Sequence, residues 1–105
     1  MPTTDPVLAK YGAAIRKLYG DRIERIVLYG SRARGDARPD SDYDIAVFVR
    51  GLKERWQESR PLADVELDIM DKDGAFVETL LFPAGYWSDP SSPLMFEIRK
   101  AGIDL

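Results

Sequence analysis

Two aspartates separated by a single residue, Asp42 and Asp44, carry the clearest chemical signal in the sequence. They flank the start of an apolar run, Tyr43–Val49 (YDIAVFV), that predicts a strand. Side chains two apart on a strand point to the same face, so the two carboxylates are expected to face one way. Carboxylates this close repel unless a cation lies between them, and two divalent cations can clamp an in-line phosphoryl or nucleotidyl transfer. An isolated Asp-x-Asp is more often a solvated turn, so the rest of the chain must decide.

A glycine and a serine, Gly30 and Ser31, directly follow a second apolar run, Ile23–Tyr29 (IERIVLY), which also predicts a buried strand. Glycine lets the backbone turn sharply and approach an anion closely, and Ser31 offers a hydroxyl and a backbone N–H at the start of a helical turn. Gly-Ser after a strand is also common in plain turns. The pair gains weight only from its position before the two aspartates.

A third acid is expected from Val65–Met70 (VELDIM), whose alternation of apolar and acidic residues predicts a strand with one polar face. Asp68 lies within this run, where an acid flanked by apolar residues is unusual unless it is paired or binds a metal. Glu66 shares its face, so the choice between Glu66 and Asp68 stays open. The alternative is that this face is simply solvated, as in many edge strands.

The composition limits the kind of site. The sequence has no cysteine and no histidine, so a metal must sit on oxygen ligands, which favours Mg²⁺, two ions being expected, or Mn²⁺. The formal net charge of -3 argues against direct binding of nucleic acid through a basic surface. No stretch resembles a secretory signal or reaches the length of a membrane span, so we expect a cytoplasmic protein without membrane contact.

The spacing of apolar residues predicts an α/β fold with a mixed β-sheet of about four strands flanked by helices, forming one domain over residues 1–105. A first helix is expected to be capped by Asp5, to begin at Pro6 and to end before Gly20, and a last one to be capped by Ser92 and to begin at Pro93. Between them the chain predicts one helical turn and five further elements: strands Ile23–Tyr29, Tyr43–Val49, Val65–Met70 and Phe76–Phe82, and a short helix over Leu52–Ser59 stopped by Pro61. Trp56 and Phe96 are expected in the core.

Taken together, the pattern G-S-x10-D-x-D, with positions 32–41 as its spacer and a third acid on a later strand, resembles the DNA polymerase β-like nucleotidyltransferase superfamily. The string GSRARGDARPDSDYDIAVFV is similar to its smallest branch, the minimal nucleotidyltransferases (MNT) encoded beside HEPN-domain proteins. The resemblance extends over about the whole chain. It implies that Gly30 and Ser31 hold the β- and γ-phosphates of a nucleotide, that Asp42 and Asp44 bind the metals, and that Asp68 completes the catalytic, metal-binding triad.

The same resemblance implies a role for Arg32 and Arg34 as nucleotide-binding residues that steady triphosphate charge. A solvated loop, or ion pairs within it, is the alternative for both. The family's larger members carry further domains that hold the acceptor, and 105 residues leave no room for one. The acceptor is therefore expected to be a protein that docks on the domain, or a partner subunit is expected to complete the site.

For function, the resemblance implies the antitoxin of a toxin–antitoxin pair, an enzyme that transfers AMP from ATP to a tyrosine of its HEPN toxin within a hetero-oligomer. Two alternatives stay open. One is the catalytic subunit of an enzyme that nucleotidylates a small molecule such as an aminoglycoside. The other is an antitoxin that acts by binding alone. ATP is expected as the donor from the family only, because no motif here reports the shape of a nucleobase pocket.

Overall fold

The computed structural model describes residues 5–105. Its elements follow one another as α1 (Pro6–Tyr19), the 3-10 turn η1 (Gly20–Arg22), β1 (Ile23–Tyr29), α2 (Ser31–Arg34), β2 (Tyr43–Val49), α3 (Arg55–Asp73), β3 (Val77–Pro83), η2 (Tyr86–Ser88), α4 (Pro93–Ala101) and β4 (Ile103–Asp104). The predicted strands over 23–29, 43–49 and 76–82 are confirmed, as are the first and last helices.

Both of those helices begin at the capping residues that the sequence predicts. The Asp5 side chain accepts a hydrogen bond from the backbone N–H of Val7, and that of Ser92 accepts one from Met95. Each caps a helix that starts with proline, whose missing N–H costs nothing in the first turn. These local signals are sufficient to define where α1 and α4 start.

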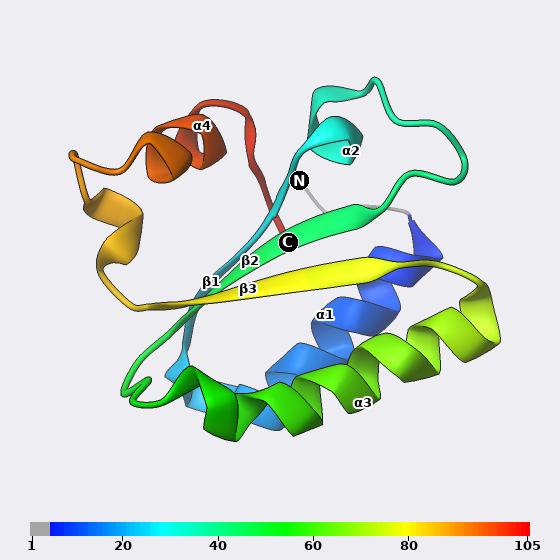
Figure 1. The fold of residues 1–105 in the computed structure, drawn as a ribbon, viewed down its shortest axis with the longest axis horizontal. Coiled ribbons are helices and arrows are strands. Elements are labelled where there is room, and N and C mark those ends of the chain that lie inside the picture. Colours follow the sequence, from blue (N-terminus) through cyan, green and yellow to red (C-terminus); the bar gives the residue numbers. More distant parts are fainter. Residues whose placement is uncertain (1–4) are drawn as a thin grey trace.

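The four strands form one mixed sheet in the order β3-β2-β1-β4. β2 runs antiparallel to β1 and parallel to β3, while the short β4 pairs antiparallel with the other edge of β1. The helices α1 and α3 cover one face of this sheet, and α4 lies on the other (Figure 1). The predicted α/β class with a mixed sheet is therefore confirmed.

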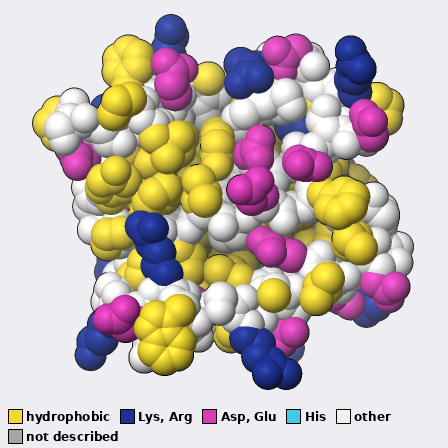
Figure 2. All heavy atoms as spheres, viewed as in Figure 1, with side chains coloured by type: hydrophobic (Ala, Val, Ile, Leu, Met, Phe, Trp, Pro, Cys, Tyr) yellow, Lys and Arg dark blue, Asp and Glu magenta, His cyan; other side chains and the backbone are white. Residues whose placement is uncertain are grey.

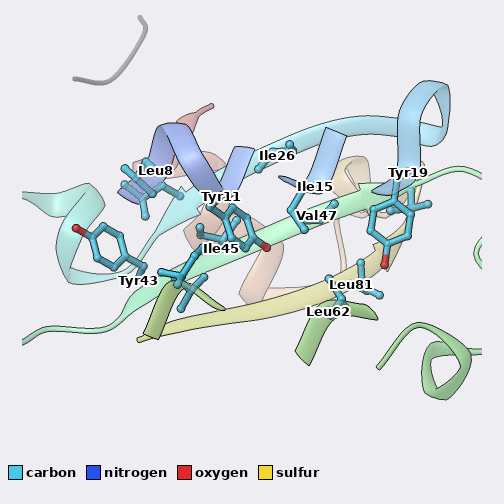
Figure 3. Packing of buried hydrophobic residues seen from close by; sticks show 14 residues of the cluster. Leu8, Tyr11, Ile15, Tyr19, Ile26, Tyr43, Ile45, Val47, Leu62 and Leu81 are labelled. Atoms are coloured by element: carbon cyan, nitrogen blue, oxygen red, sulfur yellow. The ribbon is translucent and has the colours of Figure 1, made fainter. Parts of the chain in front are cut away.

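The covered face holds the larger part of the core. Leu8, Tyr11 and Ile15 of α1 pack against Ile45 and Val47 of β2, as Figure 3 shows, and α3 adds Leu62 and Ile69. On the other face, α4 and η2 pack against Val27, Ala46, Phe48 and Phe82. This second layer is incomplete. It lies over the end of the face at which β1 begins, whereas only the one-turn helix α2 lies at the end where β1 finishes and β2 and β3 begin (Figure 1).

The region between β2 and β3 differs from the prediction. Neither the short helix over Leu52–Ser59 nor the strand over Val65–Met70 is present, because one long helix, α3, spans Arg55–Asp73. VELDIM alternates, but its apolar residues also match helical spacing, and Ile69 packs on the core together with Leu62, seven residues earlier. Pro61 lies inside the helix and removes one backbone donor, a cost that burial of the apolar stripe offsets.

Two further expectations are wrong. Trp56 and Phe96 were predicted in the core, but 71% and 56% of their surfaces are exposed. Trp56 lies on the outer side of α3, and the core positions of α4 belong to Met95 and Ile98.

No helix among residues 5–105 is both long and apolar enough to cross a membrane.

Candidate active site

The turn between β1 and α2 is built around Gly30. Its backbone adopts φ 76° and ψ -157°, a conformation that residues with a Cβ rarely take. A Cβ at this position would also collide with the carboxylate of Asp44. Glycine is therefore required twice over, for the turn and for the close approach of the turn to Asp44.

Asp44 and Asp42 lie at the start of β2, as predicted. Asp44 is the register partner of Tyr29 across the β1–β2 pair and is half-buried, whereas Asp42 is exposed. Burial raises the pKa of the Asp44 carboxyl above its usual value, and the negative charges of Glu78 and then Asp42 raise it further, while Arg34 opposes them. The two aspartates thus occupy a region of excess negative charge that one arginine only partly balances.

The third acid near them is Glu78 of β3. It is the register partner of Asp44 in the parallel β2–β3 pair, so the two side chains share a face of the sheet. Figure 2 shows acidic side chains gathered near the middle of this view, beside an apolar area. Glu78 was missed because the third acid was sought in VELDIM. The signal that could have revealed it is an acid in the run FVETLLF, which was correctly predicted as a strand.

Two basic residues of α2 have different surroundings. Arg34 is exposed, lies 3.5 Å from Asp36 through its Nε atom, and is close enough to Asp44 to lower the pKa of that carboxyl. The Arg32 guanidinium instead turns to the loop that follows, where it donates hydrogen bonds to the backbone carbonyls of Ser41 and Pro39. Ser31 begins α2 and is half-buried. Of the two arginines, Arg34 is the one that lowers the pKa of Asp44.

Comparison with known proteins decides the family. The family model of the polymerase beta nucleotidyltransferases matches residues 14–81, a range that contains Gly30, the two aspartates and Glu78. The chain belongs to this nucleotidyltransferase family.

Individual relatives agree with this assignment. Two proteins of Methanocaldococcus jannaschii that carry the name "Putative protein adenylyltransferase" are similar in sequence. MJ1305 is 30% identical over 76 residues, which cover 71% of this chain and 52% of the relative, so the chain spans about half of its length. MJ0141 is 20% identical over 99 residues, 94% of this chain and 95% of the relative.

Among solved structures, the nucleotidyltransferase fold is similar to a chain in a crystal structure of a toxin–antitoxin with AMP-PNP. The TM-score is 0.65 at 18% identity, and the match covers 91% of this chain and 69% of the other. At that identity the similarity concerns the fold.

The structure does not bring Asp68 to the two aspartates of this nucleotidyltransferase domain. Asp68 lies on α3, which packs on the opposite face of the sheet from Asp44. Its carboxylate pairs with Lys72 at 2.8 Å and with Lys10 at 3.7 Å, and the Lys72 ammonium lowers the pKa of Asp68. The strand from which Asp68 was predicted to reach the site is a helix, so the geometric reason for choosing it is gone.

Glu66, the alternative third acid, is also engaged elsewhere. Its Oε2 atom accepts a hydrogen bond of 3.0 Å from the backbone N–H of Thr79 on the edge strand β3. The Thr79 hydroxyl in turn lies 2.6 Å from the hydroxyl of the buried Tyr11. Glu66 therefore links α3 to the sheet, and it supplies a hydrogen-bond acceptor for the backbone N–H of Thr79 on the edge strand.

The carboxylates of Asp42, Asp44 and Glu78 fit a hard divalent cation in chemistry, because they supply oxygen ligands in a region of uncompensated negative charge. In residues 5–105, however, no three acidic side chains are already gathered tightly enough to form a complete cation site. Mg²⁺ commonly takes one or two carboxylates and completes its coordination with substrate phosphates and water. The donor set suits an ion that arrives together with a nucleotide.

Proposed function

We propose that the chain transfers AMP from ATP to a hydroxyl group of a partner protein. The observation that carries this proposal is the contact of three elements at one point: the Gly30 turn lies against Asp44, and Asp44 is the register partner of Glu78. A glycine turn followed by a serine can approach phosphate oxygens, and the adjoining carboxylates can hold the cations that accompany a triphosphate.

Asp42 and Asp44 would hold Mg²⁺, and Glu78 would take the part first assigned to Asp68. A bound divalent ion would supply Lewis-acid stabilisation of the phosphate oxygens. Gly30 and Ser31 are proposed to contact the β- and γ-phosphates, with Arg34 adding positive charge beside them.

In the transfer itself the acceptor hydroxyl oxygen bonds to the α-phosphorus of ATP, and the bond from that phosphorus to the oxygen bridging to the β-phosphate breaks. Pyrophosphate leaves and AMP stays on the acceptor. The proton of the acceptor hydroxyl must be removed, and the sequence has no histidine to take it. We assign that proton to the carboxylate of Glu78, and the exposure of Glu78 and its register partnership with Asp44 support this assignment.

For the acceptor we propose a tyrosine of a cognate toxin with a HEPN domain, held in a hetero-oligomer. Support comes from the names of the sequence relatives and from the fold shared with a chain of a toxin–antitoxin structure.

The proposal is tested by mass. The chain is incubated with each NTP, Mg²⁺ and the product of the neighbouring gene, and the intact masses of both proteins are read. We expect a gain of one or more AMP units on the neighbour, absent in the Asp42→Ala variant. If neither chain gains mass with any NTP, the transfer proposal is wrong.

One observation favours a second candidate, an antitoxin that acts by binding alone. Three large apolar side chains that line one hollow are exposed to solvent, namely Leu67 and Met70 of α3 and Phe76 just before β3. Exposed apolar side chains gathered on one side of a small protein are typical of a binding surface. A double variant, Asp42→Ala with Asp44→Ala, that still silences the toxin in cells would favour this candidate over transfer.

A further inference from the structure

The loop that carries Asp42 is held by one side chain. From α2, the Nε of Arg32 donates to the backbone carbonyl of Ser41 at 3.0 Å. Its Nη2 donates to the carbonyls of Ser41 at 2.9 Å, Pro39 at 3.1 Å and, more weakly, Arg38 at 3.4 Å. A single guanidinium thus binds three of the four backbone carbonyls of residues 38–41, and the residue after this loop is Asp42.

The second contact of Arg32 is with an aromatic ring. Its guanidinium carbon lies 3.9 Å from the centroid of the Tyr43 ring, well within the range of a cation–π interaction. Tyr43 stands between the two aspartates in sequence, and its side chain points to the opposite face of the sheet from theirs. Arg32 therefore contacts both neighbours of Asp42: it binds the carbonyl of Ser41 and stacks on the ring of Tyr43.

Tyr43 is itself fixed. Its side chain is 5% exposed and lies at the end of the core beside Leu8, as Figure 3 shows. Its hydroxyl donates to Oδ2 of Asp5 at 2.7 Å, and its backbone N–H donates to the carbonyl of Phe76 at 2.8 Å. Because Asp5 also caps α1, the ring on which Arg32 rests is anchored to a helix end and to the sheet.

We propose that Arg32 is a positioning residue that orders the loop 38–41 and so presents Asp42 beside Asp44. The proposal rests on the proposed function in one respect, that the aspartates hold the cations. It replaces the nucleotide-binding role expected for Arg32 from the sequence, because the Nε–Nη2 edge with which an arginine grips a phosphate is already occupied by the loop. Lysine could not replace Arg32 here, because its ammonium group can neither bind several carbonyls through a planar fork nor stack on the Tyr43 ring.

That difference between arginine and lysine supplies the test. Arg32→Lys keeps the positive charge but loses the fork and the stacking, whereas Arg32→Ala loses all three. Arg38→Ala is the matched control, because it removes a charge from the same loop while its backbone carbonyl stays available to Arg32. Tyr43→Phe removes only the bond to Asp5 and tests the anchor separately.

The first measurement needs no catalysis. Amide hydrogen exchange of the full chain is followed at Arg38 and Ser41, whose N–H groups donate to Ser41 Oγ and to the carbonyl of Arg38 within the loop. We expect both Arg32 variants to exchange these amides about tenfold faster or more, while the strands and Arg38→Ala stay near wild type. Binding of Mn²⁺ alone, read by electron paramagnetic resonance, should weaken several-fold in the same two variants.

Kinetics then separate positioning from phosphate binding. Positioning predicts a lower kcat in both Arg32 variants with little change in the KM for ATP. A raised KM for ATP in Arg32→Ala, rescued by Arg32→Lys and with unchanged loop exchange, would overturn the proposal and make Arg32 a phosphate ligand. If the wild type transfers no nucleotide, the proposed function fails by itself, and the exchange and Mn²⁺ measurements still decide whether Arg32 orders the loop.

Discussion

Asp44 and Glu78 are register partners on neighbouring parallel strands, and their side chains share the sheet face on which α4 packs, at the end away from α4 (Figure 1). Like charges placed side by side on a sheet destabilise it. This repulsion occurs where the turn at Gly30, just before α2, also lies against Asp44. Folded proteins hold such unfavourable pairs chiefly where function requires them.

The first prediction concerns Asp44→Asn. The change removes one of the repelling charges but keeps the size of the side chain. We expect transfer to fall by about 100-fold or more, because a cation ligand is lost, while the melting temperature stays the same or rises slightly. Activity and thermal unfolding of the same preparation check both parts, and a clear fall in melting temperature would contradict the repulsion described here.

A second prediction separates the two candidate third acids. Glu78→Gln should lower transfer by about 100-fold with little effect on folding, because the side chain is exposed and adjoins Asp44. Asp68→Asn should leave transfer near the wild-type rate, since it only removes ion pairs with Lys10 and Lys72. The reverse order of the two rates would restore Asp68 to the site.

Gly30→Ala is expected to damage both stability and activity. The added Cβ meets the Asp44 carboxylate and the backbone has a positive φ, so we expect a loss of about 1–3 kcal/mol in the free energy of unfolding. Gly35→Ala is the control, because Gly35 also has a positive φ, 84°, but open space around it. Denaturant unfolding of both variants should show the larger loss at Gly30, and equal losses would mean that contact with Asp44 is unimportant.

The raised pKa of Asp44 gives a pH dependence with a definite sign. Burial and its acidic neighbours make the folded carboxyl take up a proton at a higher pH than the unfolded one. The folded state therefore binds more protons in the window above the usual aspartate pKa, and this group's contribution to stability grows as the pH falls through it. Cation binding should weaken over the same window, because the ligand must be ionised.

This dependence is checked with the chain and Mn²⁺ alone, titrated from about pH 7 down to about pH 4, close to the usual aspartate pKa. We expect the affinity to fall with pH in the wild type. The stability difference between wild type and Asp44→Asn should narrow over the same descent. A difference that does not change with pH would show that Asp44 keeps an ordinary pKa.

Exposure of Trp56 makes a prediction about the fold itself. Trp56→Ala should change the free energy of unfolding by no more than about 0.5 kcal/mol, because most of this side chain is in water. Phe48→Ala is the comparison: its ring is fully buried and stacks on Phe82 at a centroid distance of 5.4 Å, and its loss should cost about 3–5 kcal/mol. Chemical denaturation of the two variants measures both values.

What the sequence could predict depended on how local each signal is. The caps at Asp5 and Ser92 and the apolar run Tyr43–Val49 are read from a few adjacent residues, and they are confirmed. The segment Val65–Met70 satisfies both the strand and the helix spacing, and only its packing on α1 and the sheet decides for the helix. The two-residue strand β4 carries no pattern at all and forms because it reaches the free edge of β1.

The candidate site divides in the same way. Gly30, Asp42 and Asp44 lie within one continuous stretch, so their proximity follows from a turn and a strand. Glu78 arrives through the register of two parallel strands joined by a 19-residue helix, and no spacing in the sequence reports that register. The hydrogen bonds from Arg32 to the loop likewise depend on the direction of its side chain, which the spacing of a motif does not specify.

The incomplete second layer has a consequence for side reactions. A nucleotide bound at the uncovered end of the sheet would remain in contact with solvent, and water can compete with a hydroxyl for the same phosphorus. A docked acceptor protein would cover that end of the sheet and exclude water when its own hydroxyl enters the site. Under the proposed function, the protein that is to be modified also excludes water from the site. Transfer to its hydroxyl is then faster than hydrolysis of the nucleotide only while that protein is bound.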